Sequence, residues 1–169
     1  MIELSLATPV DMPVIMDICD DARRFQREQG FNQWPDGYPS EEVIAADMTA
    51  SRGFMILLDG VKVGYCVIDF AGESEYDRLS DIWTSAVPYA AVHRLALSAN
   101  TRGKRMGLPL FEVIERFVVA NGISVVKVDT GLENIRMQRL LVSAGYSDLG
   151  IQQFEWGPRI AYEKMLLNK

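Results

Sequence analysis

The sequence has few of the residues that metal sites and disulfides require. It contains two cysteines and one histidine in 169 residues. Cys19 and Cys66 lie in apolar segments, with neither a CxxC pair nor a histidine cluster, so we expect buried free thiols and no metal. This use of cysteine indicates a reducing compartment, and we expect a cytoplasmic protein.

Long apolar runs and excess positive charge are also lacking. No window approaches the roughly 20 apolar residues that a membrane-spanning helix needs. Acidic residues follow too soon after the N-terminus for a signal peptide. The formal net charge is -6, so the surface as a whole repels polyanions. We expect neither a membrane nor a nucleic acid as partner, and any anion site must be local.

The sequence does contain enough apolar residues for a substantial core. Hydrophobic residues make up 49% of the chain, and the length suits one domain over 1–169. Apolar periodicity predicts helices that end near Gly30 and Ala50 and two further helices at 108–122 and 134–145. Strands are predicted at 2–8, 54–60, 61–70, 89–98, 124–130, 150–156 and 159–166. The segment 89–130 then forms a βαβ crossover with parallel strands.

The segment NTRGKRMGLPL, residues 100–110, connects a predicted strand to a predicted helix. Unpaired backbone N–H groups and the positive end of the helix dipole favour anions at such a place. The segment contains two glycines and three basic residues: Gly103, Gly107, Arg102, Lys104 and Arg105. Two interpretations are open, a phosphate-binding loop and a solvated basic turn that caps a helix. The segment matches neither a Walker A loop nor a GxGxxG dinucleotide motif.

Two motifs and the order of the elements resemble the GNAT superfamily of acetyl-CoA-dependent N-acetyltransferases over almost the whole chain. HRLALSANTRGKRMG at 93–107 is similar to that family's fourth strand and pyrophosphate loop, and DTGLENIRMQRLLVSAGY at 129–146 to its later strand, asparagine and helix. The resemblance implies an α/β (α+β) fold: one domain with a mixed central sheet of six to seven strands and about four flanking helices.

The resemblance implies acetyl-CoA as co-substrate, without a metal. The backbone of Leu95, Ala96 and Leu97 would pair with the pantetheine arm, and the Leu97 N–H would polarise the thioester carbonyl. The loop would wrap the pyrophosphate with the backbone of Arg102, Gly103, Lys104, Arg105, Met106 and Gly107. Asn134 would contact the cofactor arm; it also suits a helix N-cap, and both roles are compatible.

Two positions depart from the family pattern. Arg105 replaces the middle glycine of the loop; it can block a backbone conformation or add a cation beside the phosphates, and we favour retained binding. Leu141 stands where many members have the tyrosine that protonates the leaving thiolate. No general acid is therefore assigned, and Tyr146 resembles the aromatic residue of a glycine-aromatic turn rather than a substitute.

His93 is the candidate general base, because the attacking amine must lose a proton. It precedes Leu97 by four residues on one strand, which would place both side chains on one sheet face. The alternative is a buried structural histidine bonded to a backbone carbonyl.

The acceptor pocket is predicted from aromatic residues in two irregular segments: Trp34, Tyr38, Trp83 and Tyr89. Nearby acidic residues would suit a cationic amine. The alternative is that these aromatic side chains anchor loops in the core. Parts of the sequence also resemble a bacterial subgroup of GNAT proteins whose acceptor is undefined.

These features together predict an N-acetyltransferase that transfers acetyl from acetyl-CoA to a primary amine of a small molecule or peptide. Transfer would be direct, in a ternary complex and without a covalent intermediate, because neither cysteine is placed as a nucleophile. The alternative is a weakly catalytic or non-catalytic protein that binds CoA or acyl-CoA as a sensor or interaction module. The resemblance also makes a homodimer an expectation.

Overall fold

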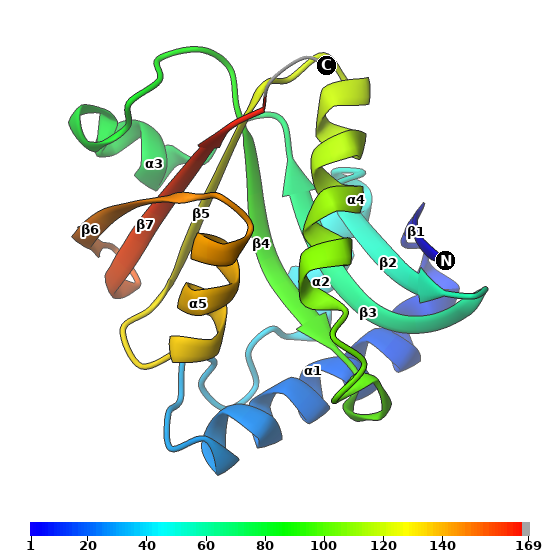
Figure 1. The fold of residues 1–169 in the computed structure, drawn as a ribbon. Helices are drawn as coiled ribbons and strands as arrows, with labels where there is room; N and C mark the ends of the chain where they lie inside the picture. The colour runs from blue at the N-terminus through cyan, green and yellow to red at the C-terminus, as the bar shows by residue number, and fades with distance from the viewer. Residues whose placement is uncertain (167–169) are drawn as a thin grey trace. The chain divides into compact units, whose positions relative to one another are not determined.

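The computed structural model describes residues 1–166 (Figure 1). The chain forms two compact units. Unit 1 comprises Met1–Ile68 and Arg94–Pro109, and unit 2 comprises Asp69–His93 and the chain from Leu110 onward. One domain over 1–169 stays a prediction.

Unit 1 contains three strands and two helices that follow one another closely in the sequence. The strands β1 (Ile2–Leu6), β2 (Gly53–Leu58) and β3 (Val61–Asp69) pair antiparallel. Asp59 and Gly60 both have positive φ, as the tight turn of a two-residue hairpin requires. The helices are α1 (Met12–Glu28) and α2 (Glu41–Thr49), and Ser40 caps α2 by accepting a hydrogen bond from the Val43 amide.

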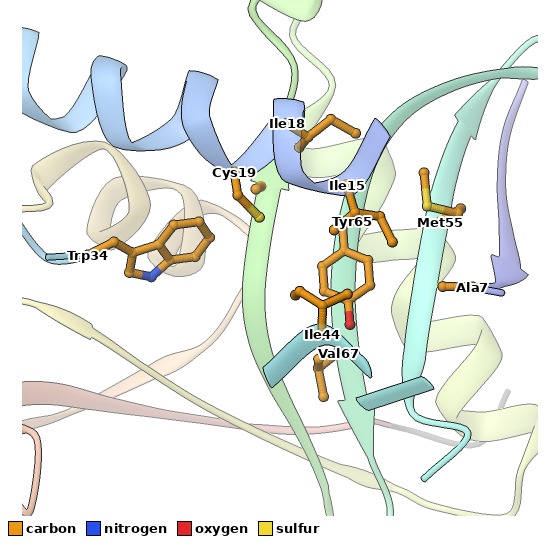
Figure 2. Close-up of a cluster of buried hydrophobic side chains, with 10 residues drawn as sticks. Ala7, Ile15, Ile18, Cys19, Trp34, Ile44, Met55, Tyr65 and Val67 are labelled. Carbon is orange, nitrogen blue, oxygen red and sulfur yellow. The ribbon is translucent and has the colours of Figure 1, made fainter. Parts of the chain in front are cut away.

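The core of unit 1 lies between its helices and its strands (Figure 2). Ile15 and Ile18 of α1 pack against Met55 of β2 and against Tyr65 and Val67 of β3. Apolar side chains three and four residues apart share one face of a helix, which explains why α1 covers the sheet at these positions.

Both cysteines are buried free thiols, as the sequence predicts. Burial raises the pKa of the Cys19 and Cys66 thiols to about 12, because a low-dielectric environment disfavours the thiolate. Neither thiol is therefore a nucleophile near neutral pH. In the described chain, no helix is long and apolar enough to cross a membrane.

Unit 2 is built on the pair β5 (Val125–Gly131) and β7 (Gly157–Met165), which run antiparallel, with β6 (Ser147–Phe154) antiparallel to β7. Its helices are α3 (Ser74–Arg78), α4 (Gly107–Ala120, from Leu110 on) and α5 (Ile135–Ser143). Asn134 caps α5, because its side chain accepts a hydrogen bond from the Met137 amide at 3.3 Å. This N-cap was predicted from the sequence.

Strand β4 (Ala90–Leu97) contributes to both units: its first four residues belong to unit 2 and its last four to unit 1. In unit 2 it pairs in parallel with β5, at Ala90↔Val126 and Ala91↔Lys127. The hydrogen-bonded order is β1-β2-β3-β4-β5-β7-β6. Residues 1–166 thus contain a mixed sheet of seven strands and five α-helices, which confirms the predicted fold class with one helix more than expected.

Candidate active site

Strand β4 is irregular at its centre. Arg94 has φ 49°, a left-handed conformation that costs a non-glycine residue about 1–2 kcal/mol. Strict alternation of side chains between the two sheet faces is interrupted there, as at a β-bulge. The inference that His93 and Leu97 share one face requires unbroken alternation, and it stays a prediction.

A fully buried carboxylate holds the Arg94 side chain. Asp47 of α2 accepts hydrogen bonds from Arg94 Nε at 2.8 Å and Nη2 at 2.6 Å, from Tyr65 Oη at 3.1 Å and from Arg52 Nε at 3.0 Å. Burial opposes the Arg94 charge, but the hydrogen bonds and charge of Asp47, together with the interactions of Tyr38, outweigh it and raise the guanidinium pKa. This network offsets the cost of the left-handed conformation.

The residues after the bulge, Leu95, Ala96 and Leu97, lie beside β3 in unit 1. A Cβ on Gly64 of β3 would stand 2.6 Å from Leu97 Cδ2 and 2.7 Å from the Ala96 carbonyl oxygen, so the close approach of the two strands requires glycine. The Ser98 amide donates to the Val63 carbonyl at 2.8 Å. The parallel ladder with β5 comprises only Ala90 and Ala91 in the described chain, so it stops before the bulge.

The loop before α4 has the backbone that a glycine-containing loop would adopt. Arg105 takes φ 52°, and Gly103 takes φ 79° with no atom within 4 Å of the position where a Cβ would stand. Arg105 therefore takes a left-handed conformation of the kind that glycine adopts without strain. Helix α4 begins at Gly107, as predicted.

Not all loop amides are available to a ligand. The amides of Arg102 and Lys104 donate to the carbonyls of Ala99 and Thr101 at 3.2 and 3.1 Å. Within residues 1–166, the amides of Gly103, Arg105 and Met106 have no acceptor. The available donors are thus fewer than the predicted 102–107 set, but they lie together at the N-terminus of α4, where anions are favoured.

The Arg102 side chain points to α1 rather than standing free. Its guanidinium lies 4.6 Å from the centre of the Phe25 ring, and Nη1 is 3.7 Å from Glu28 Oε2. Arg102 therefore ties the loop to α1, a role that the sequence did not indicate.

His93 lies in unit 2 beside a carboxylate. Its Nε2 is 3.6 Å from Glu73 Oε2, and its ring centre is 5.5 Å from that of Tyr76. The pair thus combines an imidazole with a nearby carboxylate, the two groups of a general base and its partner. Glu73 was not predicted, since nothing in its local sequence marks it off from the acidic residues that follow.

A second carboxylate, that of Asp129 on β5, lies at the other end of Tyr76. Tyr76 Oη donates to Asp129 Oδ1 at 2.5 Å, and Trp156 Nε1 donates to Oδ2 at 3.2 Å. Burial and the nearby Asp129 charge raise the Tyr76 pKa well above its ordinary value. Tyr76 is therefore held in its phenol form between His93 and Asp129.

The missing tyrosine has no replacement at its own position. Leu141 is fully buried, with 0% exposure. Tyr146 is also buried and packs edge-on against Phe111, with ring centres 5.5 Å apart. Burial, reinforced by the Glu115 charge, raises the Tyr146 pKa. Tyr146 is thus a core residue, as its place in the glycine-aromatic turn predicts.

The four aromatic residues of the predicted acceptor pocket separate into two pairs. Trp34 belongs to the core of unit 1, and Tyr38 packs beside it edge-on with ring centres 6.1 Å apart. Trp83 and Tyr89 line a cavity of about 260 Å³ in unit 2, together with Tyr76. The structure therefore places the second pair at this cavity, and it places Trp34 and Tyr38 at the core of unit 1. Within residues 1–166, no group of three or more histidine, cysteine or acidic side chains is arranged to hold a metal ion.

Comparison with known proteins places this geometry in a family. The model of the acetyltransferase (GNAT) family matches residues 18–146. An acetyltransferase of the GNAT family from Streptococcus agalactiae 2603 is 25% identical, with a TM-score of 0.86 over 99% of this chain and 96% of that one. No curated protein matches the chain.

Two more distant structures share the fold. The aminoglycoside acetyltransferase AAC(6')-Ib in complex with coenzyme A is 16% identical, with a TM-score of 0.69 over 98% of this chain and 95% of that one. A putative phosphinothricin N-acetyltransferase is 15% identical, with a TM-score of 0.68 over 99% of this chain and 100% of that one. The family match over most of the sequence shows that this chain belongs to the acetyltransferase (GNAT) family.

Proposed function

We propose that this protein transfers an acetyl group from acetyl-CoA to a primary amine of a small-molecule or peptide acceptor. The observation that carries the proposal is the His93–Glu73 pair. His93 lies two residues before Leu95 on β4. Two residues of a strand span about 7 Å, so a proton acceptor lies close to the backbone proposed to hold the cofactor arm.

The described residues fit acetyl-CoA. The free amides of Gly103, Arg105 and Met106 at the start of α4 suit a pyrophosphate, and the open space around Gly103 allows it to approach. Leu95 to Leu97 would pair with the pantetheine arm, and Asn134 would contact it. When bound, acetyl-CoA supplies an activated thioester.

In the proposed reaction, His93 takes the proton of the amine, and Glu73 stabilises the resulting imidazolium. Attack by the neutral amine forms the C–N bond and breaks the C–S bond, while the Leu97 N–H stabilises the charge that develops on the carbonyl oxygen. The attacking nitrogen then loses its second proton to water, and the thiolate takes a proton from water, since Leu141 has none to give. No acyl-enzyme is required, in agreement with two buried thiols of pKa about 12.

Leu141 favours a second candidate, a protein that binds CoA or acyl-CoA without efficient turnover. A thiolate that lacks a positioned acid leaves more slowly. Such a protein would act as a sensor or interaction module.

Release of CoA thiol, measured over a panel of amines, separates the two candidates. The panel includes aminoglycosides and phosphinothricin, because structures with this fold carry those names, and also polyamines, amino acids and peptides. We expect His93→Ala to lower kcat about 100- to 10,000-fold, and Glu73→Gln to lower it less, with unchanged acetyl-CoA affinity.

Acetyl-CoA binding without turnover on any amine would establish the second candidate. Full turnover by His93→Ala would instead remove that residue from the mechanism. A homodimer and a cytoplasmic location stay predictions; light scattering on the purified chain tests the first, and cell fractionation the second.

A further inference from the structure

The cavity of unit 2 contains a buried cation. It has a volume of about 260 Å³ and is lined by α3, by the segment before β4 and by Lys127 of β5. Lys127 is 4% exposed. A charged side chain at this depth is rare unless it is paired, so the groups around its ammonium decide its role.

The ammonium of Lys127 is surrounded by rings rather than by hydrogen-bond acceptors. Its Nζ lies 3.9 Å from the centre of the Tyr89 ring and 4.6 Å from that of Trp83. In the described part of the chain, no hydrogen bond or ion pair joins this ammonium to an oxygen. Ring faces attract the charge but leave the three N–H donors of the ammonium unused.

Two carboxylates lie near Lys127, but neither is within ion-pair distance of its ammonium, and the buried Oε1 of Glu163 has no hydrogen-bond partner among residues 1–166. Glu163 is its cross-strand partner on β7, and Glu163 Oε2 accepts from both the amide and the hydroxyl of Thr84. Asp77 also lines the cavity, but it is exposed and its Oδ1 accepts from Tyr89 Oη at 2.8 Å. The charged side chains that line the cavity are therefore Lys127, which is buried, and Asp77, which is exposed at the rim; Glu163 lies behind the lining.

The cavity lies next to the proposed base. Tyr76 is one of its walls and also contacts the His93 ring. Lys127 pairs with Ala91, two residues before His93 on β4, a separation of about 7 Å along the strand. One small molecule can span that distance with opposite ends at the two side chains.

We propose that Lys127 binds a carboxylate of the acceptor, so that the acceptor is a small amino acid whose amine faces His93. A carboxylate would accept the unused ammonium hydrogen bonds, and Trp83 and Tyr89 would flank the carbon chain. This inference rests on the proposed N-acetyltransferase activity, because it names the acceptor of that reaction.

The test compares matched acceptors by thiol release: glycine, β-alanine, 4-aminobutyrate and 5-aminopentanoate, each against its carboxamide. We expect the preferred acid to exceed its amide about 10- to 100-fold in kcat/KM, the value of a charge-assisted hydrogen bond. Lys127→Met should reduce that ratio to about one, and Lys127→Arg should restore part of it.

Lys164→Met is the matched control. Lys164 is a partly buried lysine on β7 of the same unit, but it binds Glu115 at 2.7 Å and does not line the cavity. This variant should keep the preference for the acid. Thermal unfolding of each variant confirms that it is folded.

Binding of 3-phenylpropionate and 3-phenylpropionamide, measured by calorimetry without acetyl-CoA, separates this inference from the proposed function. Binding of the acid alone, lost in Lys127→Met, supports the cationic site. Turnover without any preference for acids, or a preference that survives Lys127→Met, overturns the inference and leaves the N-acetyltransferase proposal standing. Absence of turnover on every amine overturns both the acetyltransferase proposal and the acceptor assignment, whatever the calorimetry shows.

Discussion

Asp47 in unit 1 and Lys127 in unit 2 are both buried charges, but their surroundings differ. Four hydrogen bonds from three side chains converge on Asp47. Lys127 has two ring faces and, among residues 1–166, no hydrogen-bond acceptor. A buried charge with a complete set of partners stabilises a conformation, whereas one with unused donors lining a cavity is available to a ligand.

Asp47→Ala should produce the largest change in stability. It leaves the Arg94 guanidinium without its carboxylate and removes the constraint on a left-handed residue, so we expect the free energy of unfolding to fall by about 3–5 kcal/mol. Urea unfolding followed by circular dichroism measures it. Asp36→Ala is the control: Asp36 pairs with Arg27 at the surface, and its loss should cost less than about 1 kcal/mol. Equal losses of unfolding free energy in the two variants would contradict the stabilising role assigned to the buried Asp47 network.

Arg105→Gly should raise stability by about 0.5–1 kcal/mol. Arg105 is left-handed like Arg94, but among residues 1–166 no carboxylate holds it. Glycine therefore relieves more strain than the added freedom of the unfolded chain costs. Arg102→Gly is the matched control in the same loop. Arg102 has φ -58° and contacts Phe25, so its replacement by glycine should lower stability.

The affinity of Arg105→Gly for acetyl-CoA, measured by calorimetry, should stay similar or weaken modestly. A large gain in affinity would mark Arg105 as a defect and favour the sensor.

Lys127→Met should change the free energy of unfolding by less than about 1 kcal/mol near neutral pH. Methionine fills a similar volume, and the cost of burying the ammonium disappears together with its attraction to the rings. Urea unfolding followed by circular dichroism measures this change as well. A loss as large as that of Asp47→Ala would show that Lys127 is structural.

The smallest effect concerns pH. Burial lowers the Lys127 pKa, although Glu163 and Asp77 oppose the shift. Between this lowered pKa and the unfolded value of about 10.4, the unfolded state binds more protons, so stability rises with pH there. The stability of wild type relative to Lys127→Met should therefore increase from neutral to alkaline pH. A relative stability that falls over this range would contradict the assigned environment.

The sequence predicted elements wherever the signal was local. The Asn134 cap and the start of α4 each depend on residues a few positions apart. The family resemblance, confirmed by the match over residues 18–146, also rests on contiguous motifs.

The features that the sequence did not predict depend on contacts between residues far apart in the sequence. Asp47 and Arg94 are 47 residues apart in the sequence. The residues of β4 give no sign that the strand is irregular at Arg94. Glu73 and His93 are joined only by the fold. Lys127 did carry one signal, a lone cation in the apolar run SVVKVDT, because a charge inside a buried strand requires either a partner or a function. The cofactor and acceptor residues otherwise stay predictions.

Because both native cysteines are buried, their thiols should not react with mild disulfide reagents while the protein is folded. A single engineered thiol, such as Ser80→Cys at the wall of the cavity, would then be the one reactive position on the folded protein. Reversible disulfide capture of small thiol-bearing amines and acids at that position would rank fragments by their fit to the cavity, even before any acceptor is known.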